Sequence, residues 1–289
     1  MEHFGETFRQ LRTYKGMTLK YVTQGITSVS LLSKFERNEC ELTFPNFNKL
    51  LQRINVTLNE FMYIHNQYTR DNFKEFVALL RQQYTQGNVE AIKNRLNQEI
   101  ENSDDLIDSR LNIIMIKSIL ADLTGEPVDI GDIEYLTNYL WSVEYWHDYE
   151  ITLYGNSLHI LPVDSVILLS KEIFNKGHLY TRLLNYRRDM YGVIFNTIRI
   201  CIKKGRFDDA QYFLNMINNS KPSEQFILEK MLCKFWHGIL LISSGNHEEG
   251  INICNNFLSF LQITESHGNY TLHSNYLEET IKKHEQKTH

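Results

Sequence analysis

The pattern that most constrains the fold is a glycine-centred turn that recurs about every 40 residues. Four such turns contain Gly87, Gly125, Gly205 and Gly245, at steps of 38, 80 and 40 residues. Residues 161–165 divide the long step into two halves. Glycine commonly ends a helix, and acidic residues favour the first turn of the next one. A period near 40 built from paired helices predicts a helical solenoid.

The spacing predicts five helical hairpins over residues 67–289, in a right-handed α-helical, tetratricopeptide-like array that ends in a capping helix near residues 267–283. We expect the first helices of the hairpins at residues 68–86, 106–123, 147–157, 184–203 and 225–243. A hydrophobic content of 42% argues against disorder, and four prolines in 289 residues with helical apolar spacing predict an all-α protein.

The first 66 residues have a different organisation and predict a separate domain. Short amphipathic segments are expected at residues 4–14, 18–24, 28–35, 46–54 and 57–66. Gly25-Ile26-Thr27 between the second and third segments predicts the tight turn of a helix-turn-helix. The sequence therefore predicts a five-helix domain that reads DNA.

The third segment would be the recognition helix, with Ser28 as its N-cap. Val29, Ser30 and Lys34 would face base edges in the major groove. Residues suited to holding phosphates are Ser33, Arg37, Arg12, Lys15 and Lys20. Arg12 and Arg37 have a structural alternative as ion-pair partners, and Glu36 is expected to fold back towards an arginine of the first segment.

Charge is divided unevenly along the chain, whose net charge is −5. Residues 1–66 hold eight Lys and Arg against six Glu, which gives +2 there and −7 for the rest. A mildly positive N-terminal domain on an acidic body suits specific binding to DNA, with a homodimer expected, better than general binding to polyanions.

The four cysteines, Cys40, Cys201, Cys233 and Cys254, have no spacing typical of a metal or redox motif. We expect buried thiols. Cys40 differs because it follows the recognition helix in a polar loop, where a dimer contact or an inter-subunit disulfide is an alternative to a plain small residue.

The repeat body offers a candidate surface for an extended peptide on the helices that would line its concave side. The fourth first helix carries Asn196 and Arg199, an amide and a guanidinium suited to a peptide backbone and a carboxylate. Neighbouring candidates are Arg188, Tyr191, Phe195, Asn156, His147, Trp146, Phe235 and Trp236. The alternatives are that Trp146, Phe235 and Trp236 belong to the core, and that Arg188 and His147 are ordinary surface residues.

Several motifs carry a resemblance to a known family. The N-terminal segment resembles XRE-type (lambda-repressor-like) helix-turn-helix domains. LRTYKGMTLK, SVSLLSKFERNE and RINVTLNEF, with WHDYEITLYGNS in the body, resemble the Rgg/GadR/MutR transcriptional regulators. Asn38 departs from the usual glycine of this pattern, but asparagine tolerates a left-handed backbone. The resemblance implies a homodimer that binds promoter DNA and responds to a short hydrophobic signalling peptide in quorum sensing.

Other classes of protein have less support in the sequence. The chain shows no phosphate-binding glycine loop, metal-ligand motif or nucleophile elbow, so we expect neither an enzyme nor a bound cofactor or metal. No apolar run is long enough to span a membrane and no signal-peptide pattern is present, so a cytoplasmic location is expected. The alternative functions are a helical-repeat interaction scaffold and a regulator triggered by a non-peptide signal.

Overall fold

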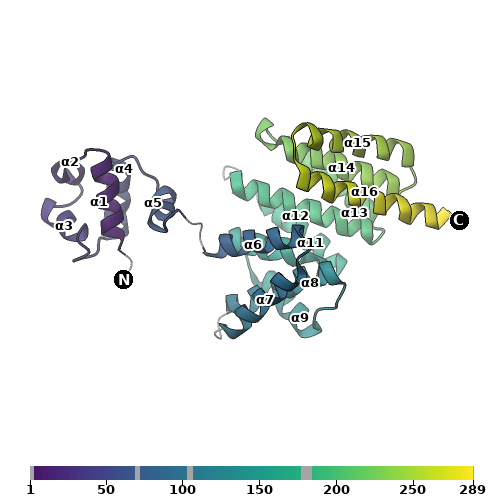
Figure 1. Cartoon of the computed structure of the whole chain (residues 1–289), viewed down its shortest axis with the longest axis horizontal. Helices are drawn as coiled ribbons and strands as arrows, with labels where there is room; N and C mark the ends of the chain where they lie inside the picture. Colours follow the sequence, from purple (N-terminus) through teal and green to yellow (C-terminus); the bar gives the residue numbers. More distant parts are fainter. Residues whose placement is uncertain (1–2, 69–71, 103–106, 177–183, 289) are drawn as a thin grey trace. The chain divides into compact units, whose positions relative to one another are not determined.

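The structure, a computed structural model, describes residues 3–68, 72–102, 107–176 and 184–288. Every regular element within these ranges is helical, in agreement with the all-α prediction (Figure 1). Contacts divide the chain into two compact units, Met1–Arg81 and Gln82–His289.

The N-terminal helices agree closely with the segments expected from the sequence. They are α1 (Phe4–Tyr14), α2 (Leu19–Thr23), α3 (Val29–Phe35), α4 (Phe44–Arg53) and α5 (Leu58–His65). The largest difference is at α4, which begins two residues before the predicted start because Pro45 fits the first turn of a helix.

The core of this unit consists of buried apolar side chains from all five helices, including Phe8, Leu32 and Phe61. Gly5 allows α1 to lie directly against the end of α3, since a Cβ there would come within 1.7 Å of the Phe35 carbonyl oxygen. Asn38 takes the left-handed conformation with φ of 59°, as expected, and its Oδ1 accepts a hydrogen bond from the Gly5 amide at 3.1 Å.

The later helices form hairpins at the predicted places. α6 (Asn72–Thr85) and α7 (Val89–Glu101) are followed by α8 (Ile107–Thr124), α9 (Ile130–Ser142), α10 (Asp148–Ser157), the short η1 (Leu158–Ile160), α11 (Val163–Lys176), α12 (Leu184–Lys203), α13 (Phe207–Asn219), η3 (Glu224–Phe226), α14 (Ile227–Ser243), α15 (His247–Ile263) and α16 (His267–Thr288). All four predicted turn glycines have positive φ, between 64° and 104°. They therefore end the helices as the sequence pattern predicted.

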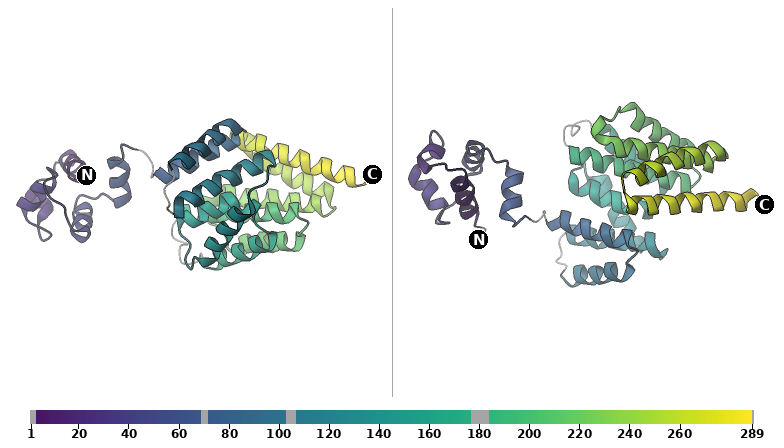
Figure 2. Two further views of the ribbon diagram at one scale, coloured as in Figure 1. Left: turned by 90° about the horizontal axis from the view of Figure 1, so that it is seen from below. Right: turned by 45° about the horizontal axis from the view of Figure 1, so that its top comes forward.

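Figure 2 shows the helices of the body packed beside one another. First helices contact one another directly, α8 with α10, α10 with α12, and α12 with α14. α13 packs against both α12 and α14, and α15 against both α14 and α16. The first helices thus form an inner layer, whose exposed side is called the inner face from here on.

The tightest contact in the body lies between α14 and α15. Gly238 and Gly250 face each other there, and a Cβ on Gly238 would lie 2.7 Å from the Gly250 carbonyl oxygen. The core around this contact includes Phe235, Cys254 and Phe257. Close packing of this kind fixes the angle between the two helices, because the interior cannot give way without losing contacts.

Candidate nucleic-acid interface and inner polar face

The N-terminal end of α3 presents the side chains that the sequence assigned to base edges. Ser28 caps the helix, and its Oγ accepts a hydrogen bond from the Leu31 amide at 3.1 Å. Val29 is 44% exposed, and Ser30 and Lys34 are also exposed. Leu32 is buried on the opposite side, so the helix is held by its core face while its first turn stays free.

A groove of about 630 Å³ lies between the beginnings of α2 and α3. Its lining includes the predicted residues Lys20, Ser28 and Val29, together with Tyr21 and Gln24. Two neighbouring helix N-termini and an exposed lysine favour an anion, and a DNA phosphate fits that chemistry.

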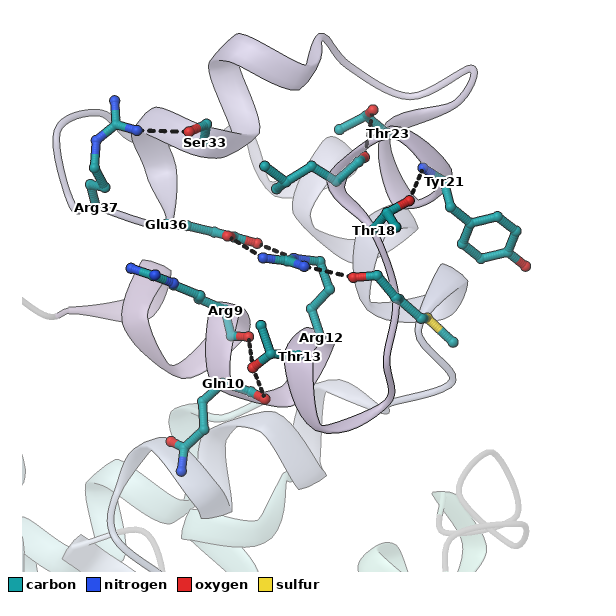
Figure 3. Close-up of polar contacts among 12 residues, drawn as sticks. Arg9, Gln10, Arg12, Thr13, Thr18, Tyr21, Thr23, Ser33, Glu36 and Arg37 are labelled. Atoms are coloured by element: carbon teal, nitrogen blue, oxygen red, sulfur yellow. Dashed lines mark hydrogen bonds and ion pairs between the residues drawn. The ribbon is translucent and has the colours of Figure 1, made fainter.

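Arg12 has the structural role that the sequence left as its alternative. Its Nε and Nη2 donate to the Glu36 carboxylate at 2.6 and 2.8 Å, and its Nη1 donates to the Met17 carbonyl at 2.6 Å (Figure 3). The hydrogen bond to Glu36 raises the pKa of Arg12 although burial opposes it. Both partners are buried, so Arg12 is not offered to a phosphate. The expected return of Glu36 to the first helix is confirmed.

Other cations of this unit are also engaged within the protein. Lys15 Nζ donates to the Ile54 and Asn55 carbonyls at 2.6 and 2.9 Å and so caps α4. Arg53 donates to the Tyr21 and Gln24 carbonyls at 3.1 Å, which ties α4 to the turn before α3. Sequence patterns did not indicate either contact, because its partners are 29 to 40 residues apart.

Arg37 is exposed but paired. Its guanidinium donates to both carboxylate oxygens of Glu39 at 2.6 and 2.8 Å, and to Ser33 Oγ at 2.7 Å. Figure 3 shows Arg37 and Ser33 side by side at the end of α3. Ser33 and Arg37, both predicted to hold phosphates, therefore lie together. Glu39 lies beside Arg37 and was not among the predicted residues.

Cys40 is half-buried, and its Sγ donates weakly to the Leu31 carbonyl at 3.6 Å. It lines a groove of about 790 Å³ whose other walls include Phe4, Phe44 and Leu58. The other three cysteines are buried free thiols, as expected.

In the body, half-buried polar side chains link several helices to one another on the inner face. Arg199 on α12 donates to Asp122 on α8 at 3.2 Å, and the Tyr84 hydroxyl on α6 donates to the same Asp122 oxygen at 2.7 Å. His159 contacts the Ser118 carbonyl at 2.6 Å. Asn196 Nδ2 donates to the Gly155 carbonyl at 3.1 Å, from α12 to α10.

These residues, Tyr84, Asp122, His159, Asn196 and Arg199, are called the inner polar cluster. Burial would raise the pKa of Asp122, but the charge of Arg199 and the hydrogen bond from Tyr84 outweigh it, so this pKa is lowered. Burial acts to lower the pKa of Arg199, but the negative charge of Asp122 contributes to raising it, and this pKa is raised overall. Burial lowers the pKa of His159. The cluster therefore holds one positive and one negative charge near neutral pH.

Five predicted peptide contacts lie in the core instead. Tyr191, Phe195, Trp146, Phe235 and Trp236 are all buried, and Phe235 is 0% exposed. Four of them, on α12 and α14, belong to one core formed where these helices contact their neighbours, whereas Trp146 precedes α10 and packs against Tyr154. The core alternative is therefore correct for the two tryptophans and Phe235, and Tyr191 and Phe195 join them.

The remaining predicted contacts are dispersed. Arg188 is exposed and donates to Glu229 at 2.9 Å. Asn156 Nδ2 donates to the Thr152 carbonyl of its own helix at 2.7 Å. His147 is exposed at the start of α10, where its amide donates to the Glu150 carboxylate at 2.9 Å. Of the predicted peptide residues, only Asn196 and Arg199 take part in the inner polar cluster.

Comparison with known proteins agrees with both halves of the fold. Residues 93–278 match the family described as HTH-type transcriptional regulator Rgg, C-terminal domain. The chain belongs to the Rgg family. The resemblance proposed from the sequence motifs is thereby confirmed, and the family is one of transcriptional regulators.

Solved structures share the fold over nearly the whole chain. The Streptococcus dysgalactiae SHP pheromone receptor Rgg2 is 24% identical, with a TM-score of 0.77 and coverage of 96% of this chain and 99% of that one. A Listeria monocytogenes EGD-e protein is 18% identical, with a TM-score of 0.82 and coverage of 98% of each chain. PrgX in its iCF10 complex is 16% identical, with a TM-score of 0.70 and coverage of 100% and 91%.

None of the described helices is both long and apolar enough to cross a membrane. Within the same ranges, no group of three or more His, Cys, Asp or Glu side chains is arranged to hold a metal ion.

Proposed function

We propose that this Rgg-family regulator binds promoter DNA as a homodimer, under the control of a short hydrophobic peptide held on the inner face of its repeat body. The observation that carries the DNA half is the exposed first turn of α3, fixed by a buried core and the Ser28 cap. Val29, Ser30 and Lys34 read bases, while Lys20, Ser33 and Arg37 hold phosphates.

The peptide half rests on the inner polar cluster. Asn196 and Arg199 offer an amide and a guanidinium among half-buried groups, and Asn156, Arg188 and His147 are secondary candidates around them. Rgg2 is described as an SHP pheromone receptor, and PrgX was solved with iCF10, which supports a peptide ligand here. The groove beside Cys40 supports a contact between two copies of the N-terminal domain.

The peptide regulates by preferring one arrangement of the dimer. A ligand that bound two arrangements equally could not change promoter occupancy, so binding must be coupled to a rearrangement of the body. DNA half-sites about one helical turn apart would then be engaged differently by the two recognition helices.

Duplex binding tests the DNA half. The purified protein is titrated with its own promoter fragment and with a scrambled duplex, at several salt concentrations. Ser30→Ala with Lys34→Ala should remove the preference for the promoter, while Lys282→Ala on α16 removes one exposed charge and should not. Unchanged promoter affinity in the double variant would exclude α3 as the reading helix.

Calorimetric titration tests the peptide half, with short hydrophobic peptides encoded beside the gene. Saturable binding that Asn196→Ala and Arg199→Ala weaken supports the inner face as the site. Arg206→Ala is the matched control, because Arg206 also pairs with aspartates, Asp164 and Asp209, but at the start of a second helix. Specific DNA binding without any peptide binding would leave a regulator with another trigger, and peptide binding without DNA binding would favour the scaffold.

A further inference from the structure

The ion pair between Arg199 and Asp122 bears on which peptides the inner face can accept. The side chains of Arg199 and Asp122 are 26% and 15% exposed, so both keep some access to solvent. They come from α12 and α8, 77 residues apart. An unpaired guanidinium at this place would attract a carboxylate strongly. Here the protein itself supplies that carboxylate, from Asp122.

Asp122 is held in this position from a second side. The Tyr84 hydroxyl donates to the same Oδ2 atom that Arg199 contacts, at 2.7 Å. Burial, with the negative charge of Asp122, raises the pKa of Tyr84, so the phenol stays protonated and remains a donor. The carboxylate is thus fixed by two donors on two different helices.

The other groups that act directly on the ion pair are Tyr84, His159 and Tyr276. His159 is neutral near pH 7 because burial lowers its pKa, and burial raises the pKa of Tyr276. One charge of each sign lies further out, Lys203 beside His159 and Glu279 beside Tyr276. The ion pair and its direct neighbours therefore hold one positive and one negative charge and have no net charge. A ligand carboxylate that approached Arg199 would also meet Asp122, and such a like-charge contact at a half-buried site is strongly unfavourable.

We propose that Asp122 is a resident counterion that determines ligand selectivity, so that the inner face accepts an uncharged peptide segment at Arg199 and rejects a carboxylate there. This inference rests on the proposed function, because it concerns the peptide that the body binds. It also assigns Tyr84 a positioning role, since its hydroxyl fixes the Asp122 carboxylate beside Arg199.

The test compares matched pairs of one hydrophobic peptide that binds the wild-type protein. Members of a pair differ by a single carboxylate, either a C-terminal acid against an amide or Glu against Gln at one internal position. Asp122→Asn keeps the size and hydrogen-bonding capacity of the side chain but removes its charge. For each pair, the quantity measured is the affinity for the acidic peptide divided by the affinity for the neutral one. In Asp122→Asn, this ratio should exceed the wild-type ratio about tenfold or more for at least one pair.

The ratio within a pair separates selectivity from damage to the fold, because a loosened site weakens both members alike. Tyr84→Phe should shift the same ratio in the same direction but by less. Arg199→Gln should shift selectivity the opposite way, so that Lys is favoured over Gln at the same peptide position. This variant keeps the proposal testable even if Asp122→Asn does not fold.

The outcomes are distinct. If the ratios of all pairs in Asp122→Asn equal those of the wild type, Asp122 does not set selectivity. If Arg199→Gln shows no preference for the basic peptide, the ion pair is not in the site, and the proposal fails as well. If the wild-type protein binds none of the peptides, the proposed peptide function itself is wrong, and this inference falls with it.

Discussion

One ion pair of the N-terminal unit and one of the repeat body differ in how deeply they are buried. In the N-terminal unit, Arg12 and Glu36 form a two-pronged contact whose side chains are only 10% and 4% exposed. In the body, Arg199 and Asp122 meet through one longer contact and remain open to the inner face. The first pair belongs to the interior of a small domain. The second lies in the surface that we propose for the peptide.

We therefore expect the two regions to differ in whether the same side chains serve both stability and recognition. The side chains proposed to face DNA in the N-terminal unit, such as Ser30 and Lys34, are exposed and do not support the core. In the body, Asn196 and Arg199 link one first helix to another, so under the proposed function they serve both stability and recognition. Substitutions should separate the two properties in the first region and change both in the second.

The largest effect is expected from breaking the buried pair. Arg12→Met leaves Glu36 buried without its cation and should destabilise the N-terminal unit by about 3–5 kcal/mol. Arg199→Met should cost the body less, because Asp122 is more accessible to water and keeps its bond from Tyr84. All three tryptophans lie after residue 140, so their fluorescence follows the body alone while far-ultraviolet circular dichroism follows both units.

The double variant Arg12→Met with Glu36→Leu is the control for this experiment. Removing both charges together should recover most of the loss, since the isolated buried carboxylate is the main cost. An equal loss in Arg12→Met and Arg199→Met would break the contrast between the two regions.

Glycines at close helix contacts allow a second comparison of the two regions. A Cβ on Gly5 would lie 1.7 Å from a backbone oxygen, whereas one on Gly238 would lie 2.7 Å from its nearest atoms. Gly5→Ala should therefore destabilise the N-terminal unit by about 3 kcal/mol, and Gly238→Ala should destabilise the body by about 1–3 kcal/mol. Chemical denaturation followed by the two probes measures both.

Gly192→Ala provides the matched control within α12. No atom outside its own helix lies within 4 Å of a Cβ there, so alanine should stabilise the body by about 0.5–1 kcal/mol through its helix propensity. Loss of stability in this variant would show that the space around the glycine does not govern the outcome.

Local patterns were sufficient to predict most of the fold. The five N-terminal helices, the left-handed Asn38 and the glycine turns all depend on residues close together in sequence. The return of Glu36 to the first helix was also predictable, because a carboxylate on a largely apolar helix needs a partner.

The inner face was predicted less well, because it depends on distant partners. The sequence could not show that Arg199 has a counterion 77 residues earlier. It also placed Tyr191 and Phe195 on a ligand-binding face, although both are buried. On a helix surrounded by other helices, an aromatic residue beside a polar one has the same spacing whether it contacts a ligand or the core.

We expect the stability of the body to fall measurably in acid, by less than the changes expected for the buried ion pair. Burial lowers the pKa of His159 and of His273. Between these values and the ordinary value of 6.5, the unfolded chain binds more protons than the folded one, so stability falls as pH drops below about 6.5. Each histidine contributes at most about 1.4 kcal/mol per pH unit.

Unfolding followed by tryptophan fluorescence at pH 7.5, 6.5 and 5.5, chosen to bracket roughly that value, measures this slope. His159→Gln should flatten it in part, and His159→Gln with His273→Gln should flatten it further. A slope that both variants leave unchanged would show that neither histidine causes the acid response in this pH range.

The smallest expected effect concerns Glu39, the acidic neighbour of a predicted phosphate ligand. The hydrogen bond from Arg37 lowers the pKa of Glu39, so the carboxylate is charged and, under the proposed function, competes with DNA for Arg37. Glu39→Gln should tighten promoter binding about two- to fivefold, because an exposed pair of this kind is weak. The slope of log affinity against log salt should steepen by about one, as expected for one more phosphate contact.

Glu41→Gln removes an equal charge two residues further on and should have less effect on both quantities. Equal changes in the two variants would mean that net charge alone acts, whereas a change confined to Glu39→Gln would show that the N-terminal unit, like the body, keeps a counterion beside a ligand-binding arginine.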